Sequence, residues 1–215
     1  MADGIFVVLE GIDGAGTTTQ ARLLQERLAA ELGRCLLTRE PSDGPIGMLI
    51  RQVLRGRLGG YPGSDGDAAF DRASLALLFA ADRLDHLAAE IAPALAQGSP
   101  VVCDRYVLSS LAYQSLDLDP AWVAEINARA RQPDLTLLLD VPPGDALARV
   151  HATRAATELF EEREILEQVT RNYQRFAEQD RERTTRLDGR GPVDQVQRLV
   201  WDAVEKSLAD RLRVR

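Results

Sequence analysis

Lysine is the residue that this sequence most nearly lacks. Lys206 is the single lysine among 215 residues, so arginine carries almost all of the positive charge. A phosphate site in this chain must therefore be built from arginine, whose planar guanidinium can bind phosphate through two hydrogen bonds. Cysteine and histidine are also scarce, with two residues of each. Cys35 and Cys103 lie beside or within apolar segments, which predicts buried thiols rather than a disulfide or metal ligands.

Long apolar segments and a basic surface are missing as well. No apolar run is long enough to span a bilayer, and the N-terminal residues lack the basic and apolar regions of a signal peptide. We therefore expect a cytoplasmic protein with no membrane partner. The formal net charge of −7 argues against a nucleic-acid partner, because a phosphate backbone requires a basic face. The length and a hydrophobic content of 45% predict one globular domain over residues 1–215.

A glycine-rich loop near the N-terminus is the strongest motif that is present. Gly11-Ile12-Asp13-Gly14-Ala15-Gly16-Thr17-Thr18 matches the phosphate-binding pattern G-x-x-x-x-G-K-[ST], except that Thr17 replaces the lysine that would reach the β- and γ-phosphates. All of these residues are candidate ATP contacts, and the Thr18 hydroxyl is a candidate Mg²⁺ ligand. A predicted strand before the loop and a predicted helix after it favour phosphate binding. A glycine-rich turn that binds nothing is the alternative.

Apolar segments alternate with helical patterns along the chain. Strands are predicted at Ile5–Leu9, Cys35–Thr38, Val101–Cys103, Leu135–Leu139 and around Arg186–Leu187, and helices at 18–32, 46–55, 69–97, 108–116, 120–130, 144–151, 163–179 and 192–212. This alternation predicts an α/β protein with a parallel sheet, in which ligands bind beyond the carboxyl ends of the strands. Two irregular segments are predicted to form a mobile surface loop, at 57–67, and a lid, at about 152–162.

Charged residues follow two of the predicted strands. Arg39 and Glu40 precede Pro41, which ends the second strand, so Arg39 is expected to face the ligand crevice. A solvated charge pair is the alternative. Asp104 and Arg105 follow the third strand, where a carboxylate can orient Mg²⁺ or its waters and an arginine can neutralise a phosphate.

Two sets of side chains are suited to reading a base. Phe79 and Arg83 are four residues apart on one predicted helix, so a ring could stack on the base while the guanidinium fixes its edge. The alternative places Phe79 in the core and pairs Arg83 with Asp82 or Asp85 on the surface. A polar face on the helix after Arg105 offers further donors and acceptors, from Ser110, Tyr113 and Gln114. Ser109 is an alternative helix cap.

The predicted lid is flanked by arginines. Arg149, Arg154 and Arg163 lie in or beside it, and phosphoryl transfer depends mostly on positioning and on neutralising charge. Several glutamates in the same stretch weaken this positive field, so an exposed charged loop is the alternative.

The chain resembles the thymidylate kinase family of P-loop nucleoside monophosphate kinases. The segments that carry the resemblance run in the family's order over nearly the whole chain: Phe6 to Gly16, Thr38-Arg39-Glu40-Pro41, Leu78 to Arg83, Asp104-Arg105-Tyr106 with Ser109-Ser110 and Ala112-Tyr113-Gln114, and Pro133 to Asp140. The glycine loop is shared by many nucleotide enzymes. The F-x-x-D-R and D-R-Y-x-x-S-x-x-A-Y-Q segments together are specific to this family.

The resemblance implies a P-loop NTPase-type, three-layer α/β/α fold with a five-stranded parallel sheet and a short lid, often in a homodimer. It implies transfer of the γ-phosphoryl group of ATP to dTMP, giving dTDP, with Mg²⁺ as cofactor. Arg39 and Arg105 would hold the dTMP phosphate, Phe79 would stack on thymine and Arg83 would contact its edge. The thymidine pocket would be lined by Ser110, Tyr113 and Gln114, and the phosphates and metal would be served by Asp13, Thr18 and Asp104.

Three departures from the family pattern concern the donor side and the segment after Pro41. Thr17 replaces the loop lysine, and Leu159 stands before Phe160-Glu161 where bacterial members usually have an arginine. Ser42-Asp43-Gly44-Pro45 replaces the usual two glycines and threonine. Losing one preorganised donor can cost roughly a hundred- to a thousandfold in rate, and a missing arginine finger about 10³–10⁵-fold.

Two classes of explanation follow. In an active kinase, Arg154 or Arg163 would swing onto the β- and γ-phosphates, helped by the loop amides, Mg²⁺ and the Thr17 hydroxyl. Alternatively, the chain is a non-catalytic nucleotide-binding or regulatory relative. A kinase for another nucleoside monophosphate, such as dUMP, is a third possibility.

Overall fold

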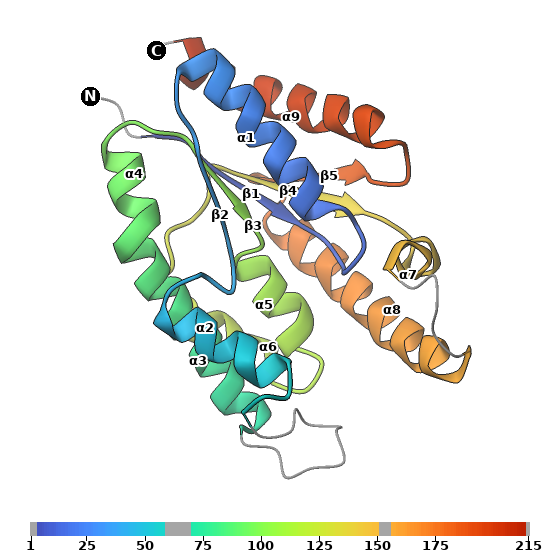
Figure 1. Cartoon of the computed structure of the whole chain (residues 1–215). Helices are drawn as coiled ribbons and strands as arrows, with labels where there is room; N and C mark the ends of the chain where they lie inside the picture. The colour runs from blue at the N-terminus through green and yellow to red at the C-terminus, as the bar shows by residue number, and fades with distance from the viewer. Residues whose placement is uncertain (1–3, 59–69, 151–155, 214–215) are drawn as a thin grey trace.

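Five parallel strands form the sheet at the centre of the molecule. The computed structural model describes residues 4–58, 70–150 and 156–213, with only the backbone described at 150, 156–162 and 210–213. The strands are β1 (Phe6–Glu10), β2 (Leu36–Arg39), β3 (Val101–Asp104), β4 (Leu135–Asp140) and β5 (Thr184–Asp188), in the order β2-β3-β1-β4-β5. The predicted α/β fold with a five-stranded parallel sheet is confirmed (Figure 1).

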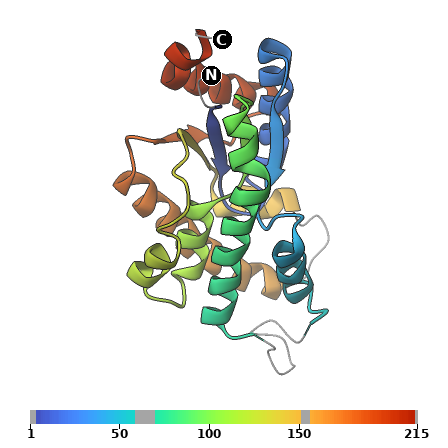
Figure 2. The ribbon, with the colours of Figure 1, turned by 90° about the vertical axis from the view of Figure 1, so that its left-hand side faces the viewer.

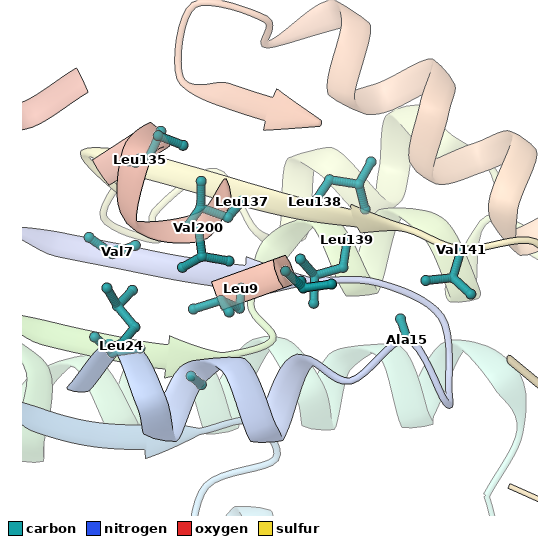
Figure 3. Packing of buried hydrophobic residues seen from close by; sticks show 14 of the residues in the cluster. Val7, Leu9, Ala15, Leu24, Leu135, Leu137, Leu138, Leu139, Val141 and Val200 are labelled. Carbon is teal, nitrogen blue, oxygen red and sulfur yellow. The ribbon is translucent and has the colours of Figure 1, made fainter. Parts of the chain in front are cut away.

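The central strand β1 is buried on both faces, which is why it reads as an unbroken apolar run. Val7 and Leu9 pack on one face with Leu24 of α1 (Thr17–Leu32) and Val200 of α9 (Val193–Arg213), as Figure 3 shows. Phe6 and Val8 point to the other face, against the π-helical segment η1 (Leu87–Ile91) and helix α4 (Ala92–Ala96). Helices therefore cover both faces of the sheet, as the three-layer fold requires.

The remaining helices surround the carboxyl end of the sheet. They are α2 (Pro45–Leu54), α3 (Arg72–His86), α5 (Val107–Gln114), α6 (Pro120–Ile126), α7 (Pro143–Val150) and α8 (Ala156–Gln179). Helix α2 packs on α3 away from the sheet, and α5 packs on α8 (Figures 1 and 2). None of the described helices is long and apolar enough to cross a membrane.

Most strands extend one residue further than the sequence predicts, and the extra residue is charged. Glu10, Arg39, Asp104 and Asp140 are each the last residue of a strand. The backbone ladder therefore fixes the position of these side chains: Leu9 pairs with Asp104, and Asp104 pairs with Arg39. Charged groups of the site consequently start from the most rigid part of the molecule.

The single long helix predicted at 69–97 is wrong in two respects. It begins at Arg72, where the Asp71 side chain caps the helix by accepting a hydrogen bond from the Ser74 amide at 2.6 Å. It is then interrupted by η1, in which the Ala92 amide donates to the Leu87 carbonyl five residues earlier. Pro93 follows directly and has no amide hydrogen to donate, so the regular hydrogen-bond pattern is not continued through this point.

The prediction of an irregular lid at 152–162 is wrong for its second half. Helix α8 begins at Ala156 rather than at residue 163, because Ala156–Glu164 is rich in the helix formers alanine, leucine and glutamate. Residues 151–155 lie outside the described part of the chain, as do residues 59–69, which include most of the loop predicted at 57–67. Helix α6 ends at Ile126, earlier than the predicted 130.

Candidate active site

The glycine loop connects β1 to α1 through two left-handed residues. Gly14 has a φ of 83° and Gly16 a φ of 94°, a region that side-chain-bearing residues rarely adopt. Gly11 is needed for a different reason, since a Cβ there would lie 2.9 Å from the Ala15 Cβ and 3.1 Å from the Leu139 carbonyl oxygen. The loop conformation therefore depends on glycine at all three positions.

The loop leaves a row of backbone donors unused. The amides of Gly14, Gly16, Thr17 and Thr18 donate no hydrogen bond to the described part of the chain, and Thr17 is the first residue of α1. These residues line a cavity of about 560 Å³, together with Arg105, Arg149 and the segment that leads into α9. Free amides at a helix N-terminus bind anions, so this cavity is suited to the phosphates of a nucleotide.

Thr18, which lines this cavity, and its partner Asp104 carry hard oxygen ligands. The Thr18 hydroxyl donates to Asp104 Oδ2 at 2.5 Å, while the buried Asp104 Oδ1 has no hydrogen-bond partner in the described structure. Oxygen atoms of this kind are the ligands that Mg²⁺ prefers. Thr17, at the lysine position, is 6% exposed. Among the described residues, no group of three or more histidine, cysteine, aspartate or glutamate residues gathers as a metal centre.

Arg105 joins the glycine loop to the neighbouring helix. It is the one residue other than glycine with a positive φ, at 73°, among those described, and its amide donates to the Leu9 carbonyl at 2.9 Å. Its guanidinium lies 2.7 Å from Asp13 Oδ1 and 5.5 Å from the centre of the Tyr113 ring. The Tyr113 hydroxyl in turn accepts a hydrogen bond from the Asp13 amide at 3.2 Å. The structure therefore brings together the predicted residues Asp13, Arg105 and Tyr113.

A buried carboxylate that the sequence analysis did not select lies below this group. Glu10 accepts hydrogen bonds from the amides of Tyr106 and Ser109, at 2.9 and 3.2 Å, and so caps the start of α5. Its second oxygen accepts from the Ser109 hydroxyl at 2.5 Å and from the Tyr173 hydroxyl at 3.2 Å. Burial raises the pKa of Glu10, and these hydrogen bonds and Arg105 oppose the increase. Ser109 is thus a Glu10 partner rather than the helix cap considered as its alternative role.

Glu10 also connects the site to α8. The Tyr173 and Ser109 hydroxyls lie 2.8 Å apart, and the Tyr173 ring meets the Tyr113 ring edge to face at 6.1 Å. Burial raises the pKa of both tyrosine hydroxyls, so both stay protonated and can donate at neutral pH. The position of Glu10, directly after a buried apolar run, was the sequence signal for this carboxylate. Tyr173 gave no such signal, because its neighbours along α8 are ordinary amphipathic helix.

Arg83, on α3, is buried among polar side chains. It is 1% exposed, and its Nη2 lies 2.7 Å from Glu40 Oε2. It also donates to Asn127 Oδ1, to the Tyr106 carbonyl at 3.1 Å and to the Ser110 hydroxyl at 3.1 Å. The alternative that paired Arg83 with Asp82 or Asp85 on the surface is therefore wrong. A contact between Arg83 and the edge of a base stays a prediction, and in this conformation protein groups hold the guanidinium.

The segment after β2 is held by a further buried carboxylate. Asp82 accepts hydrogen bonds from the Ser42 amide at 2.7 Å and from the Ser42 hydroxyl at 2.6 Å, and the Gly44 amide donates to the same hydroxyl at 3.0 Å. The departure from the family pattern at Ser42 therefore has a structural role, because its hydroxyl fixes the turn. Arg39 extends from this turn toward solvent, 54% exposed, and pairs with Asp43 at 2.9 Å.

The other residues predicted to contact the base lie on α3 and α5. Phe79 is half-buried and packs against a small apolar cluster of Ile50, Val53 and Leu75. Ser110 is buried, and its hydroxyl accepts a hydrogen bond from Arg83. The side-chain oxygen of Gln114 is buried without a hydrogen-bond partner in the described structure. Binding of thymidine by these residues stays a prediction.

Three arginines were considered for the donor side, and they differ in position. Arg154 lies outside the described residues. Arg163 is 59% exposed and pairs with Glu167 one turn further along α8, at 3.0 Å. Arg149, which was noted beside the predicted lid but not assigned to the site, lines the cavity and donates to the carbonyls of Gly14 and Ala15 at 3.4 and 3.5 Å. Lys206 is exposed on α9.

Comparison with known proteins gives one consistent result. The family model for thymidylate kinase matches residues 9–200. A probable thymidylate kinase of Pyrococcus horikoshii is 44% identical over 176 residues, covering 81% of this chain and 83% of the relative. A thymidylate kinase of Synechococcus sp. is 40% identical over 210 residues, covering 95% and 96%. A thymidylate kinase of Rhodopseudomonas palustris is 38% identical over 215 residues, covering 95% and 90%. The similarity thus includes both the glycine loop and the residues around Arg83 and Arg105.

Proposed function

The chain belongs to the thymidylate kinase family and is a phosphotransferase, and from this premise we propose that it transfers the γ-phosphoryl group of ATP to dTMP. A phosphate oxygen of dTMP attacks the γ-phosphorus, the bond to the β,γ-bridging oxygen breaks, and dTDP and ADP leave. The observation that carries the proposal is the contact between the Arg105 guanidinium, which follows β3, and Asp13 of the glycine loop, at 2.7 Å. An arginine at this point can hold an acceptor phosphate beside the donor phosphates.

The donor half of this proposal uses backbone more than side chains. The free amides of the loop would bind the β- and γ-phosphates, and the N-terminus of α1 would favour their negative charge. Thr18 and Asp104 fit Mg²⁺, since one of the Asp104 oxygens is buried without a partner and both residues offer hard oxygen ligands. When bound, Mg²⁺ would offset the negative charge of the phosphates.

The acceptor half would use the residues that the family resemblance assigns. Arg39 and Arg105 would bind the dTMP phosphate, and the exposed position of Arg39 leaves it free to turn from Asp43 to a ligand. Phe79 would stack on thymine, and Arg83, Ser110, Tyr113 and Gln114 would line the rest of the pocket. Because Arg83 is held by Glu40 and Ser110, any base contact from it would come from a fixed guanidinium.

The missing loop lysine leaves two other functions to be tested. A non-catalytic nucleotide-binding relative would keep the loop, but it would have no use for an acceptor arginine held against Asp13. A kinase for another monophosphate, such as dUMP, differs only in the base. The hypothesis that Arg154 or Arg163 contacts the β- and γ-phosphates also remains, and for Arg163 it requires release from Glu167.

A coupled assay of ADP formation with ATP, Mg²⁺ and dTMP tests the proposal. We expect dTMP-dependent turnover that is lost without Mg²⁺ and lowered roughly a hundredfold or more by Asp104→Asn. Competition among dTMP, dUMP, dCMP and dGMP identifies the monophosphate that the protein prefers as phosphoryl acceptor. No dTMP-dependent turnover, with ATP binding intact by calorimetry, identifies the non-catalytic alternative, whereas faster turnover with another monophosphate identifies the third.

We further propose that the protein forms a homodimer through α3, as the family resemblance implies. Leu77 and Leu84 of α3 are 50% and 41% exposed, and their spacing of seven residues places them on one face of the helix. Light scattering during size-exclusion chromatography tests this. A monomeric mass at micromolar concentration contradicts it.

A further inference from the structure

We propose that Arg149 supplies the positive charge of the donor site that Thr17 cannot provide, and that it does so by holding the glycine loop through its backbone carbonyls. The inference rests on the proposed ATP-dependent function but concerns a residue that the family pattern of the loop does not include. Four carbonyl contacts, the geometry of one peptide group and the pairing of the other arginines support it.

Arg149 bridges the two walls of the donor cavity. It lies in the last turn of α7, and Nη1 donates to the carbonyls of Gly14 and Ala15 at 3.4 and 3.5 Å. Nη2 donates to the carbonyls of Gly189 and Arg190 at 3.0 and 3.2 Å, on the segment leading to α9. The guanidinium therefore connects the phosphate loop to the segment before α9, and Gly14, Ala15 and Gly189 line the cavity with it.

Two of these contacts act on peptide groups of the loop that lines the cavity. The Ala15 carbonyl and the Gly16 amide belong to one planar trans peptide group, in which C=O and N–H point in opposite directions. A guanidinium at the carbonyl therefore holds the Gly16 N–H in the opposite direction and polarises it. Gly16 has a φ of 94°, a conformation that glycine adopts at little steric cost, so a contact that fixes this peptide group selects one of several conformations open to glycine. Thr17, buried at the next position, brings no charge to this task.

Arg149 also differs from the other arginines of the site in its partners. Arg39 pairs with Asp43, Arg105 with Asp13 and Arg163 with Glu167. Within the described part of the chain, Arg149 donates to backbone carbonyls and forms no ion pair with a carboxylate. Arg149 is exposed to solvent, so a bound polyphosphate can approach its guanidinium. A guanidinium that binds backbone carbonyls at the edge of the loop brings to this place the positive charge that a donor site without a lysine requires.

The decisive experiment restores the missing lysine. Four proteins are compared: wild type, Arg149→Ala, Thr17→Lys and the Thr17→Lys/Arg149→Ala double variant. For each, calorimetry gives the Kd for Mg-ATP without acceptor, and steady-state kinetics give kcat and the KM for each substrate. We expect Arg149→Ala to weaken ATP binding at least tenfold and to lower kcat on the order of 10²–10³-fold, with the KM for dTMP little changed.

The double variant distinguishes a donor role from mere packing. If Arg149 supplies the missing charge, Thr17→Lys recovers at least tenfold of both ATP affinity and kcat in the Arg149→Ala background. Arg149→Lys should retain part of kcat, because lysine keeps the positive charge but cannot form the four hydrogen bonds of the guanidinium to carbonyl oxygens. Arg198→Ala, on α9, is the matched control, since Arg198 is 71% exposed and pairs with Asp194; it should stay within threefold of wild type.

Two results overturn the proposal. One is ATP affinity and kcat of Arg149→Ala within threefold of wild type. The other is a folded double variant with no recovery in either quantity. Should Thr17→Lys fail to fold, millimolar methylguanidine added to Arg149→Ala decides instead, with recovery of kcat supporting the proposal and none opposing it. The calorimetric comparison needs no acceptor, so it remains valid even if dTMP is not the substrate.

Discussion

Arg83 and Arg149 lie on opposite sides of the site, and their guanidiniums have very different surroundings. Arg83 is 1% exposed and faces the Glu40 carboxylate, with Asn127 and Ser110 as further partners. Arg149 is exposed and touches only backbone carbonyls among the described residues. The proposed acceptor side is thus organised around a buried ion pair, whereas the proposed donor side is organised around a loop with amides that donate no hydrogen bond to the described part of the chain.

The difference shows where each half of the site obtains its geometry. On the acceptor side, positions are set before any ligand binds, because a buried charge remains stable only with its partner in place. On the donor side, the loop conformation depends on glycines and on one guanidinium. We expect stability to be sensitive to changes on the acceptor side, and nucleotide affinity to be sensitive to changes on the donor side.

The largest effect on stability is expected from Glu40→Gln. This change keeps the shape of the side chain but leaves the Arg83 charge buried without a carboxylate, which should lower the free energy of unfolding by about 3–5 kcal/mol. Urea denaturation measures it. Glu26→Gln is the control, because the Arg22–Glu26 pair is about half exposed on both sides and should change stability by roughly 0.5 kcal/mol or less. A loss below about 1 kcal/mol for Glu40→Gln would mean that the buried pair does not organise the acceptor side.

A smaller effect on stability is expected from Gly16→Ala, on the donor side. The cavity leaves space for the methyl group, so the cost comes from the positive φ and should be about 1–2 kcal/mol. ATP affinity should fall as well, since the Gly16 amide faces the cavity. Gly144→Ala on α7 also meets no atom, but it lies in a helix, where alanine should stabilise by roughly 0.5–1 kcal/mol. Equal effects of the two substitutions would argue against strain at Gly16.

A third effect is the pH dependence of stability expected from Glu10, which lies between the two halves. Burial raises its pKa above the ordinary value of 4.5, so the folded protein takes up a proton at a higher pH than the unfolded chain. The free energy of unfolding of wild type, relative to Glu10→Gln, should therefore increase as the pH falls from 7 toward 4.5, by at most about 1.4 kcal/mol per pH unit. Denaturation of both proteins at several pH values measures this difference. A difference that does not vary with pH would show that Glu10 titrates alike in both states.

The fold could be predicted because its signals are local. Five short apolar runs separated by helical patterns are sufficient to predict a parallel sheet, and all five strands were found near the expected residues. The break in the helix after His86 was missed, because Pro93 in a strongly apolar helix can be accommodated in several ways. The early start of α8 was missed because the sequence around Ala156 carries no distinct helix-start signal.

The site was predictable in its residues but less so in their contacts. The spacing of Phe79 and Arg83 could not show that Arg83 is buried against Glu40, since that partner is 43 residues away. Arg149 was visible only as a charge near the predicted lid. Its contacts with Gly14 and Ala15 join residues about 135 positions apart, so they depend on the assembled fold and not on any local pattern.

The scarcity of lysine has a practical consequence for labelling. Reagents that react with amines would find Lys206 on the exposed surface of α9, apart from the chain's own N-terminal amine. Val193 lines the donor cavity, and Lys206 lies thirteen positions further along the chain, which corresponds to roughly 20 Å along a helix. A fluorophore attached there would report on nucleotide binding from outside the site. Amine-reactive ATP analogues that trap a loop lysine would in turn leave this phosphate loop unmodified.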